Sequence, residues 1–587
     1  MKTGSGRVSL VRVGKSTNTD SITTIEVETF LEELAEGSFE ERRRGQTVVV
    51  AGSVNLCRHP LRTKIASLPG ATITGDLIAD YGCALRACRA RVSGMVSLDG
   101  SHIEELSPEP GTAEGARMGV GGKVSAKGCA RLRKISGTFD SDVSLDGSGI
   151  EEIGSDFLCE GVLSVEGCGS LRSLDCCAVS VIADGSALEE TGPNAAIENL
   201  SAEGCLNLTK ATPIRGLKWA KYDGSGIEEV HPRFLCKGPV YFKRCRRLTS
   251  LAGEAGSIEV SMAPLKRIGN LAAGRGMIFT DCRNLPTGMG GLRSKTLVFA
   301  RCDLEELPAG IQPDTDVRIG QCPDFSTLPT QWRGDISLTE LPSLQETPEG
   351  FKCMGKFDVE WCENLTRVSG FVGGDLHLMS KLPQLTRLDD DLEVGGDLWV
   401  SPHAGLLSVG CKIRGSLTAK AGPLRETSDK LEVGGNGDFH GSPELRILRG
   451  KFGGKVILDE TTVEALGADI EIGGDLSMRK TPNLTSLNCS VGGHVIVKNS
   501  GLRRTGPAFR CGKGLEVRNC PNFDTLQGEV KGVQRISRQK RSTENSEGEA
   551  RGTTAKPLRA RTVDESRPPN RVYPNKWFAP GGLNEGR

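Results

Sequence analysis

Cysteine is the residue type of this chain with the widest chemical range. The sequence holds 20 cysteines, and most of them recur at fixed places in a repeated pattern. Nine share one position: Cys129, Cys168, Cys205, Cys245, Cys282, Cys302, Cys322, Cys362 and Cys520. Four share a second position, each two residues after a Phe: Cys159, Cys236, Cys353 and Cys511. None of these spacings gives the C-x-x-C pair that a zinc site uses. We therefore predict buried thiols that serve a repeat.

Other residues that could do chemistry are scattered. Seven histidines are spread along the chain without ligand spacing or a neighbouring nucleophile. Gly14-Lys15-Ser16 matches the end of a phosphate-binding loop, but Ser9 stands where the first Gly belongs. Gly122-Lys123 is followed by Val124 in place of Ser or Thr. The sequence therefore predicts no catalytic residue, no metal site and no small-molecule cofactor.

The composition gives no support for a nucleic-acid-binding, membrane-spanning or Sec-secreted protein. The net charge is zero over 587 residues, which offers no argument for nucleic acid or an anionic membrane as partner. No apolar run of about 18 residues exists, so no membrane span is predicted. The N-terminal residues lack the apolar core of a secretory signal peptide. Twenty cysteines without such a signal favour reduced thiols.

A repeat organises the elements that carry these residues. From Gly75 to Lys513 about 23 units follow one another, each about 20 residues long. The longer form reads Leu163, Val165, Cys168, Leu171, Leu174, and the shorter form reads Val143, Leu145, Ser148, Ile150, Ile153. Gly-Gly pairs open many units in the second half, as at 373–374 and 395–396. A period of this length indicates a stack of coils whose neighbours share one core.

Each unit begins with two apolar residues that are two apart, which places both on one face of a strand. Neighbouring strands about 4.8 Å apart would build a parallel sheet on the order of 110 Å long. The Cys or Ser at the turn is expected to satisfy backbone groups of the adjacent coil. The fold class that we predict is a mainly β repeat solenoid.

The pattern L-x-L-x-x-[N/C]-x-L resembles the leucine-rich-repeat family over residues 75–530. Its short period is similar to that of the leucine-rich effectors of bacterial type III secretion systems, although their L-P-x-L-P opening is mostly missing. The resemblance implies an arc with one long parallel sheet and a concave binding face. It also implies export by a non-Sec route into a host cytoplasm, with the bacterial cytoplasm as the alternative.

The segments outside the repeat are predicted as follows. Residues 1–24 are disordered and could hold an export signal, and residues 25–74 form an N-terminal cap and a first irregular coil. The cap is a short helix with Ile25, Phe30, Leu31 and Leu34 near one face. Residues 107–121 are a surface insertion. Residues 531–587 are a disordered basic tail, with 13 Lys and Arg against 6 Asp and Glu.

The tail permits two interpretations. It could make weak nucleic-acid contacts, or it could be only a solvated segment that keeps the last coil soluble. The roles of Trp577 and Phe578 stay open.

The outward strand positions are the candidate site. The residue between the two apolar strand positions points away from the core, and in this chain those positions are varied and include aromatic and charged residues. The predicted binding residues are Tyr241, Lys243, Arg318, Asp358, Glu360, His377, Trp399 and Arg518. A plain solvent-facing surface is the alternative interpretation, but an exposed Trp399 favours binding.

We therefore expect a non-enzymatic protein that binds another protein, from a host cell, through its sheet. One alternative is an enzyme, similar either to the effector ubiquitin ligases or to a β-helix that acts on polysaccharide. Cys322-Pro323-Asp324 matches the ligase Cys-x-Asp signature, but it lies inside a coil. Asp358 and Glu360 are only a weak carboxylate cluster for the β-helix enzyme. A surface scaffold is a third possibility, for which a secretory signal should exist.

Overall fold

The computed structural model describes residues 21–108, 119–288 and 291–537. Two compact units are present: Met1–Lys295 with Pro308–Gln312, and Thr296–Leu307 with Pro313–Arg587. Below they are called the first and the second unit. The predictions made for residues 1–20, for most of the insertion at 107–121 and for residues 538–587 lie outside the described residues.

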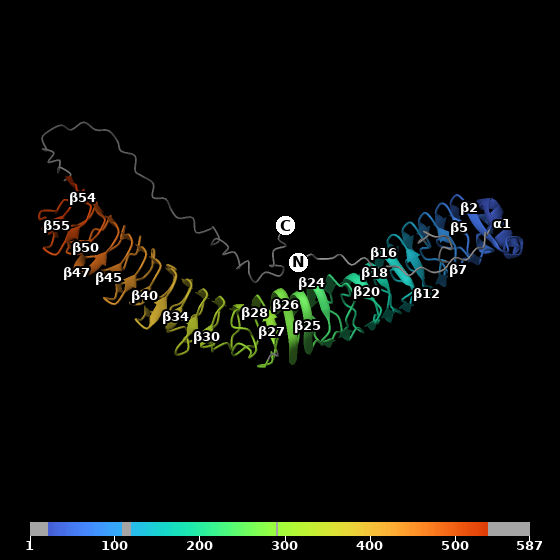
Figure 1. The fold of residues 1–587 in the computed structure, drawn as a ribbon, viewed down its shortest axis with the longest axis horizontal. Coiled ribbons are helices and arrows are strands. Elements are labelled where there is room, and N and C mark those ends of the chain that lie inside the picture. Colours follow the sequence, from blue (N-terminus) through green and yellow to red (C-terminus); the bar gives the residue numbers. More distant parts are fainter. Residues whose placement is uncertain (1–20, 109–118, 289–290, 538–587) are drawn as a thin grey trace, which may run out of the picture. The chain divides into compact units, whose positions relative to one another are not determined.

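The chain is a mainly β parallel solenoid of about 25 turns with very few helices. Figure 1 shows the strands of each unit stacked side by side. One strand of each coil joins a ladder that we call the main ladder, and all of its pairings are parallel. The prediction of a mainly β repeat solenoid is confirmed.

In the first unit the main ladder consists of β3 (Val54–Asn55), β6 (Leu77–Ile78), β9 (Val96–Ser97), β11 (Val124–Ser125), β14 (Val143–Ser144), β16 (Phe157–Ser164), β18 (Cys177–Ile182), β20 (Ala196–Ser201), β22 (Trp219–Lys221), β24 (Leu235–Lys243), β25 (Ser250–Ser261) and β26 (Arg267–Thr280). In the second unit it consists of β28 (Thr296–Ala300), β29 (Asp316–Gly320), β31 (Ile336–Thr339), β33 (Phe357–Glu360), β35 (Leu376–Met379), β38 (Leu398–Val400), β41 (Leu417–Thr418), β44 (Gly437–Asp438), β46 (Val456–Ile457), β48 (Leu476–Arg479), β51 (His494–Lys498), β54 (Gly514–Arg518) and β56 (Gln534–Ser537).

The coils pair at further positions as well. In the second unit one additional ladder contains β36 (Arg387–Leu388), β39 (Ser408–Val409) and β42 (Glu426–Thr427). Another contains β32 (Lys352–Cys353), β34 (Gly370–Val372), β37 (Leu392–Val394) and β40 (Lys412–Ile413). The leucine-rich-repeat resemblance implied one long sheet, but the coils form further parallel ladders beside the main one. A coil without helices has to satisfy its backbone N–H and C=O groups on its neighbours, all around its perimeter.

Gly-Gly pairs lie where one coil crosses closely over the next. A Cβ atom on Gly395 would lie 2.3 Å from the carbonyl oxygen of Gly373, and one on Gly396 would lie 2.8 Å from that of Gly374. The Asp that follows a pair caps the next coil, since Oδ1 of Asp375 accepts the backbone N–H of Asp397 at 3.0 Å. The Gly-Gly-Asp segments therefore have a structural role.

The turn after most main-ladder strands has a residue with positive φ. In seven consecutive coils of the first unit Gly supplies it, as at Gly128 (φ 66°) and Gly147 (φ 64°). From Arg244 (φ 58°) onward residues with side chains take this position in most coils. Such a backbone conformation costs roughly 1–2 kcal/mol for a residue with a Cβ atom.

The residue after this turn points into the core and carries the cysteine ladder. Sγ of Cys168 donates to the carbonyl oxygen of Leu145 at 3.1 Å and lies 3.6 Å from Oγ of Ser148. Cys245 repeats the arrangement with the carbonyl of Tyr222 at 3.1 Å. The 13 repeat cysteines are all buried. The predicted structural role of the thiols is confirmed, and in the coils of the first unit where Cys and Ser alternate the thiol lies beside the hydroxyl of the preceding Ser coil.

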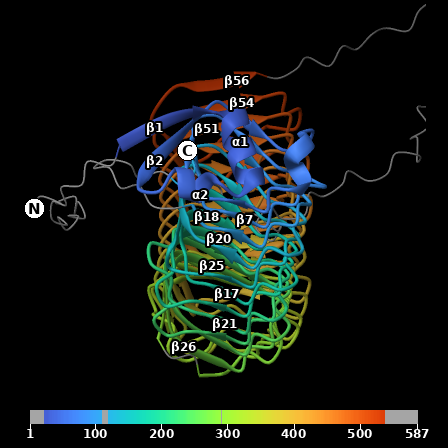
Figure 2. The same cartoon turned by 90° about the vertical axis from the view of Figure 1, so that its right-hand side faces the viewer.

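The N-terminal end of the solenoid is covered by a small cap. It contains β1 (Ser21–Glu26), α1 (Val27–Glu36) and α2 (Phe39–Arg42), and β1 pairs with β2 (Gln46–Ala51). Figure 2 shows the two helices across the first coils. Phe30 and Leu31 are buried, and the rings of Phe30 and Phe39 are 5.3 Å apart. The predicted capping helix is present, although Ile25 belongs to β1 and not to the helix.

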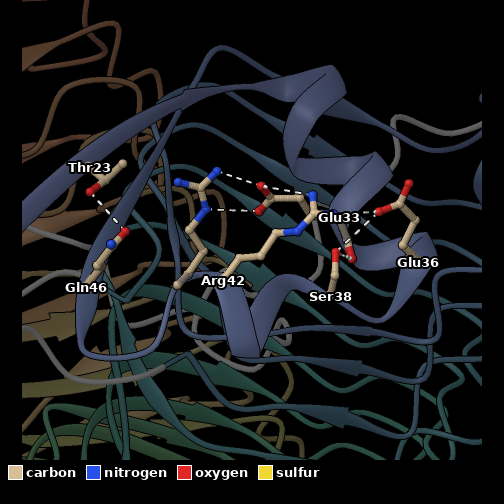
Figure 3. Close-up of polar contacts among 7 residues, drawn as sticks. Thr23, Glu33, Glu36, Ser38, Arg42 and Gln46 are labelled. Atoms are coloured by element: carbon tan, nitrogen blue, oxygen red, sulfur yellow. Dashed lines mark hydrogen bonds and ion pairs between the residues drawn. The ribbon is translucent and has the colours of Figure 1, made fainter.

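One buried carboxylate ties the two cap helices together. Glu33 on α1 lies 2.6 Å from the guanidinium of Arg43 and 3.8 Å from that of Arg42. The hydrogen bond from Arg43 lowers the pKa of Glu33. Figure 3 shows these contacts beside the bond between Thr23 and Gln46, which is 3.1 Å long. Strands β1 (Ser21–Glu26) and β56 (Gln534–Ser537) include residues that were predicted to be disordered, at 21–24 and 534–537.

Candidate binding face

Four of the predicted site residues lie in one row on the outer face of the second unit. The strand registers pair Arg318 with Ser337, Ser337 with Asp358, Asp358 with His377 and His377 with Trp399. The row forms because the residue between two core positions must point outward on every strand. Neighbours in it are about 4.8 Å apart.

Asp358 and His377 form the polar centre of this row. Oδ1 of Asp358 lies 2.8 Å from Nδ1 of His377. The oxygen is buried, yet it has no hydrogen-bond partner, so the contact meets the distance of a hydrogen bond but not its angle. Burial raises the pKa of the Asp358 carboxyl. This carboxylate therefore has unused capacity to accept a donor.

Trp399 supplies an apolar surface beside that centre. Its ring lies 6.2 Å from the ring of His377 in an edge-to-face arrangement, and the residue is 43% exposed. Large exposed aromatic groups next to polar side chains are typical of protein-binding sites.

Glu360 extends the site along the second outward position of β33. Its Oε1 accepts from Nε1 of Trp361 and from Oγ of Ser380, both at 2.9 Å. Nζ of Lys381 lies 5.5 Å from the centre of the Trp361 ring. Trp361, Ser380 and Lys381 did not appear among the predicted residues. Periodicity gave no signal for them, because Trp361 and Ser380 lie at a turn with positive φ that the alternation of apolar residues does not reveal.

Arg518 is far from this group. It lies on β54, six pairings from β38, or about 29 Å along the ladder. It forms an ion pair with Glu516, which also lies 3.3 Å from Lys498. The structure thus does not bring Arg518 together with Trp399.

Tyr241 and Lys243 form a separate group in the first unit. Nζ of Lys243 lies 5.2 Å from the Tyr241 ring centre and 3.0 Å from Glu259. The rings of Tyr241 and Trp219 are 6.5 Å apart. This group is a second aromatic surface on the outer face of the first unit.

Three arrangements that could do chemistry do not form among the described residues. Ser337 and His377 lie on strands at opposite sides of β33, so no Ser–His contact forms. A hydrogen bond with Cys302, together with burial, raises the pKa of the Cys322 thiol, which disfavours the thiolate that a nucleophile needs. Within residues 21–108, 119–288 and 291–537, no group of three His, Cys, Asp or Glu side chains could hold a metal ion. No helix in the same ranges is long and apolar enough to cross a membrane.

Comparisons with known proteins add no relative. No protein-family model matches the chain, and neither the curated proteins nor the solved structures give a significant match.

Proposed function

We propose that the chain is a non-enzymatic protein that binds another protein through the Asp358–His377–Trp399 row of the second unit. The observation that carries the proposal is the buried Oδ1 of Asp358, which lacks an aligned donor beside an exposed Trp. A buried acceptor left unpaired costs about 1–3 kcal/mol. A partner that donates an N–H group at this point would recover that cost.

The row has the composition of a small interaction centre. Trp399 offers a broad apolar contact at low entropic cost, and Asp358 offers directional polarity. Glu360 and Lys381 stand at the rim, where charges favour specificity and association rate over affinity. These features support a partner segment with an apolar side chain close to an amide, Lys or Arg donor.

The test compares purified full-length protein with two folded variants, Trp399→Ala and Asp358→Asn. Arg518→Ala is the matched control, because Arg518 is an outward residue of the same ladder about 29 Å away. Proteins from a eukaryotic lysate are captured, and the dominant one is then purified and titrated directly. We expect the two row variants to lose at least tenfold in affinity and the control to bind like wild type.

Two results would overturn the proposal. One is equal binding by wild type and the two row variants. The other is saturable binding of a polysaccharide at this row with turnover of the chain, which would favour the enzyme alternative. Circular dichroism and the melting temperature show that the variants are folded.

The resemblance to short-repeat effectors supports a further part of this proposal, namely that the partner is a host protein reached by type III export. A reporter fused to the N-terminal 24 residues measures it. Delivery into host cells by a secretion-competent strain, and not by a secretion-deficient one, is the expected result. Equal reporter signal from both strains contradicts export by this route.

A further inference from the structure

A cavity of about 530 Å³ opens on the first unit. Its lining comes from three successive coils: Arg246, Met262, Ala263, Pro264, Asp281 and Arg283. None of these residues was among the predicted binding residues. The lining combines two guanidinium groups with an apolar floor.

The repeat places the two arginines in equivalent positions. Arg246 follows Cys245, Arg283 follows Cys282, and Pro264 follows Ala263 in the coil between them. The coils pair through β24, β25 and β26, so the two arginines stand about 10 Å apart along the stack. At the corresponding place the Cys coils before Arg246 have Ala130, Gly169 and Leu206. The two arginines are thus a local departure from the repeat.

The backbone here also departs from the coils before it. Arg244, Met262 and Asp281 have φ of 58°, 53° and 53°. The same turn is made by Gly in the seven preceding coils: Gly100, Gly128, Gly147, Gly167, Gly185, Gly204 and Gly224. Most later coils also have a side chain at this turn, so the conformation alone does not mark a site. Here it places Met262, which is 45% exposed, and Asp281 in the wall of the cavity.

The guanidinium groups of the cavity are available to a ligand. Nearby cations are neutralised, since Arg247 lies 2.8 Å from Glu228 and Lys243 lies 3.0 Å from Glu259. Arg246 and Arg283 form no ion pair within the described part of the chain. Asp281 is the single acidic residue on the lining, so two cations face one anion.

We propose that this cavity binds a phosphate-bearing ligand. Arg246 and Arg283 would hold the oxyanion, because the planar guanidinium matches phosphate oxygens with two parallel hydrogen bonds. Met262 and Pro264 would contact an apolar part of the same ligand. Asp281 would disfavour small, highly charged anions and so favour a ligand with a single phosphate group.

The test uses calorimetric titration of the full-length protein with three probes: inorganic phosphate, glucose 6-phosphate, and vesicles containing a tenth phosphatidic acid in phosphatidylcholine. The soluble ester and the vesicles distinguish a free phosphate ester from a lipid headgroup. The variants are Arg246→Ala with Arg283→Ala, and Asp281→Asn. Arg131→Ala is the control, since Arg131 is an exposed arginine of another coil.

We expect saturable binding of one phosphate probe by wild type and control, a loss of at least tenfold in the double variant, and tighter binding in Asp281→Asn. Binding that survives in the double variant belongs elsewhere, for example to the basic residues 531–587, and overturns the proposal. So does the absence of saturable binding for all three probes. A double Lys variant, Arg246→Lys with Arg283→Lys, retains charge and should recover part of the affinity, which separates a binding defect from a folding defect.

Discussion

The carboxyl groups of Asp358 and Asp375 differ in the direction in which folding shifts their pKa. Burial raises the pKa of Asp358 above its ordinary value of 3.8. The N–H of Asp397 lowers the pKa of Asp375 from the same value. A raised carboxyl pKa means that the ionised group destabilises the fold above that pKa, and the cost disappears as pH falls through it. A lowered pKa means stabilisation that is present above pH 3.8 and is lost on acidification.

The first prediction uses these opposite signs. At pH 7, Asp358→Asn should leave the melting temperature equal to or above that of wild type, whereas Asp375→Asn should lower it. The Asp358 difference should shrink as pH falls through its raised pKa toward 3.8, and the Asp375 difference should shrink only as pH falls from 3.8 toward its lowered pKa. Thermal melts over a pH series measure this. If Asp358→Asn destabilises the protein at neutral pH, the ionised carboxylate has a stabilising partner and the unpaired-acceptor argument fails.

The second prediction concerns the thiol ladder. Cys168→Ser should cost less than about 1 kcal/mol, because Ser already occupies this position in alternate coils and can donate to the Leu145 carbonyl. Cys168→Val removes one of the two donors to that carbonyl, since the N–H of Ser148 also donates to it at 3.0 Å, and should cost about 0.5–1.5 kcal/mol more than Cys168→Ser. Amide hydrogen exchange in β16 and β18 reports the difference. Equal costs for both variants would show that the thiol acts by packing alone.

At the scale of one coil, glycine serves two separate purposes. Gly128 has positive φ and nothing within 4 Å of an added Cβ, whereas a Cβ on Gly473 would lie 2.4 Å from the carbonyl oxygen of Gly453. The first glycine is needed for its backbone angles and the second for close approach between coils.

The third prediction follows from that difference. Gly128→Ala should cost about 1–2 kcal/mol through backbone conformation alone, and Gly128→Asn should cost less, since Asn tolerates this region. Gly473→Ala should cost about 3 kcal/mol, because two backbones have to move apart, and Gly473→Asn should be no better. Urea titrations followed by circular dichroism measure the four variants. If Gly473→Asn were more stable than Gly473→Ala, the close-approach explanation would be contradicted.

The features that could be predicted from the sequence are those that recur at a fixed position in every unit of the repeat. The two-residue alternation at Leu163 and Val165 gave the main ladder, and the shared position of the cysteines gave their burial. The other ladders were not predicted, because residues such as Leu388 and Val409 follow the preceding buried apolar residues, Leu385 and Leu406, at a spacing of three and not at the two-residue alternation of a strand. Their strand character arises from pairing with adjacent coils.

The residues of the candidate binding face also fall into those that the sequence could predict and those that it could not. The outward row from Arg318 to Trp399 could be predicted, because alternation fixes which side chains leave the core. Trp361, Lys381 and the cavity arginines could not, because their direction depends on a positive-φ turn that periodicity does not reveal. The separation of Arg518 from the row likewise needed the number of coils between them.

At the scale of the whole molecule, contacts are mostly between adjacent coils, so damage should remain local. The fourth prediction is that Phe30→Ala, which removes a buried ring of the cap, accelerates amide exchange in β1 and β2. The local cost should be about 3–5 kcal/mol. Exchange in β24 and β25 should stay at the wild-type rate. Uniform acceleration throughout the first unit would instead indicate that its coils unfold together.

The in-register pairing of the main ladder also fixes the distances between surface positions along the second unit. Every coil advances the stack by one strand spacing, about 4.8 Å. Gain or loss of a whole coil would therefore shift the surfaces on either side of it by a fixed step, whereas a change of half a coil would destroy the register. Duplication or deletion of complete coils would thus change the distance between two surface sites, such as the Asp358–His377–Trp399 row and the region of Arg518, and would leave the residues of each site unchanged.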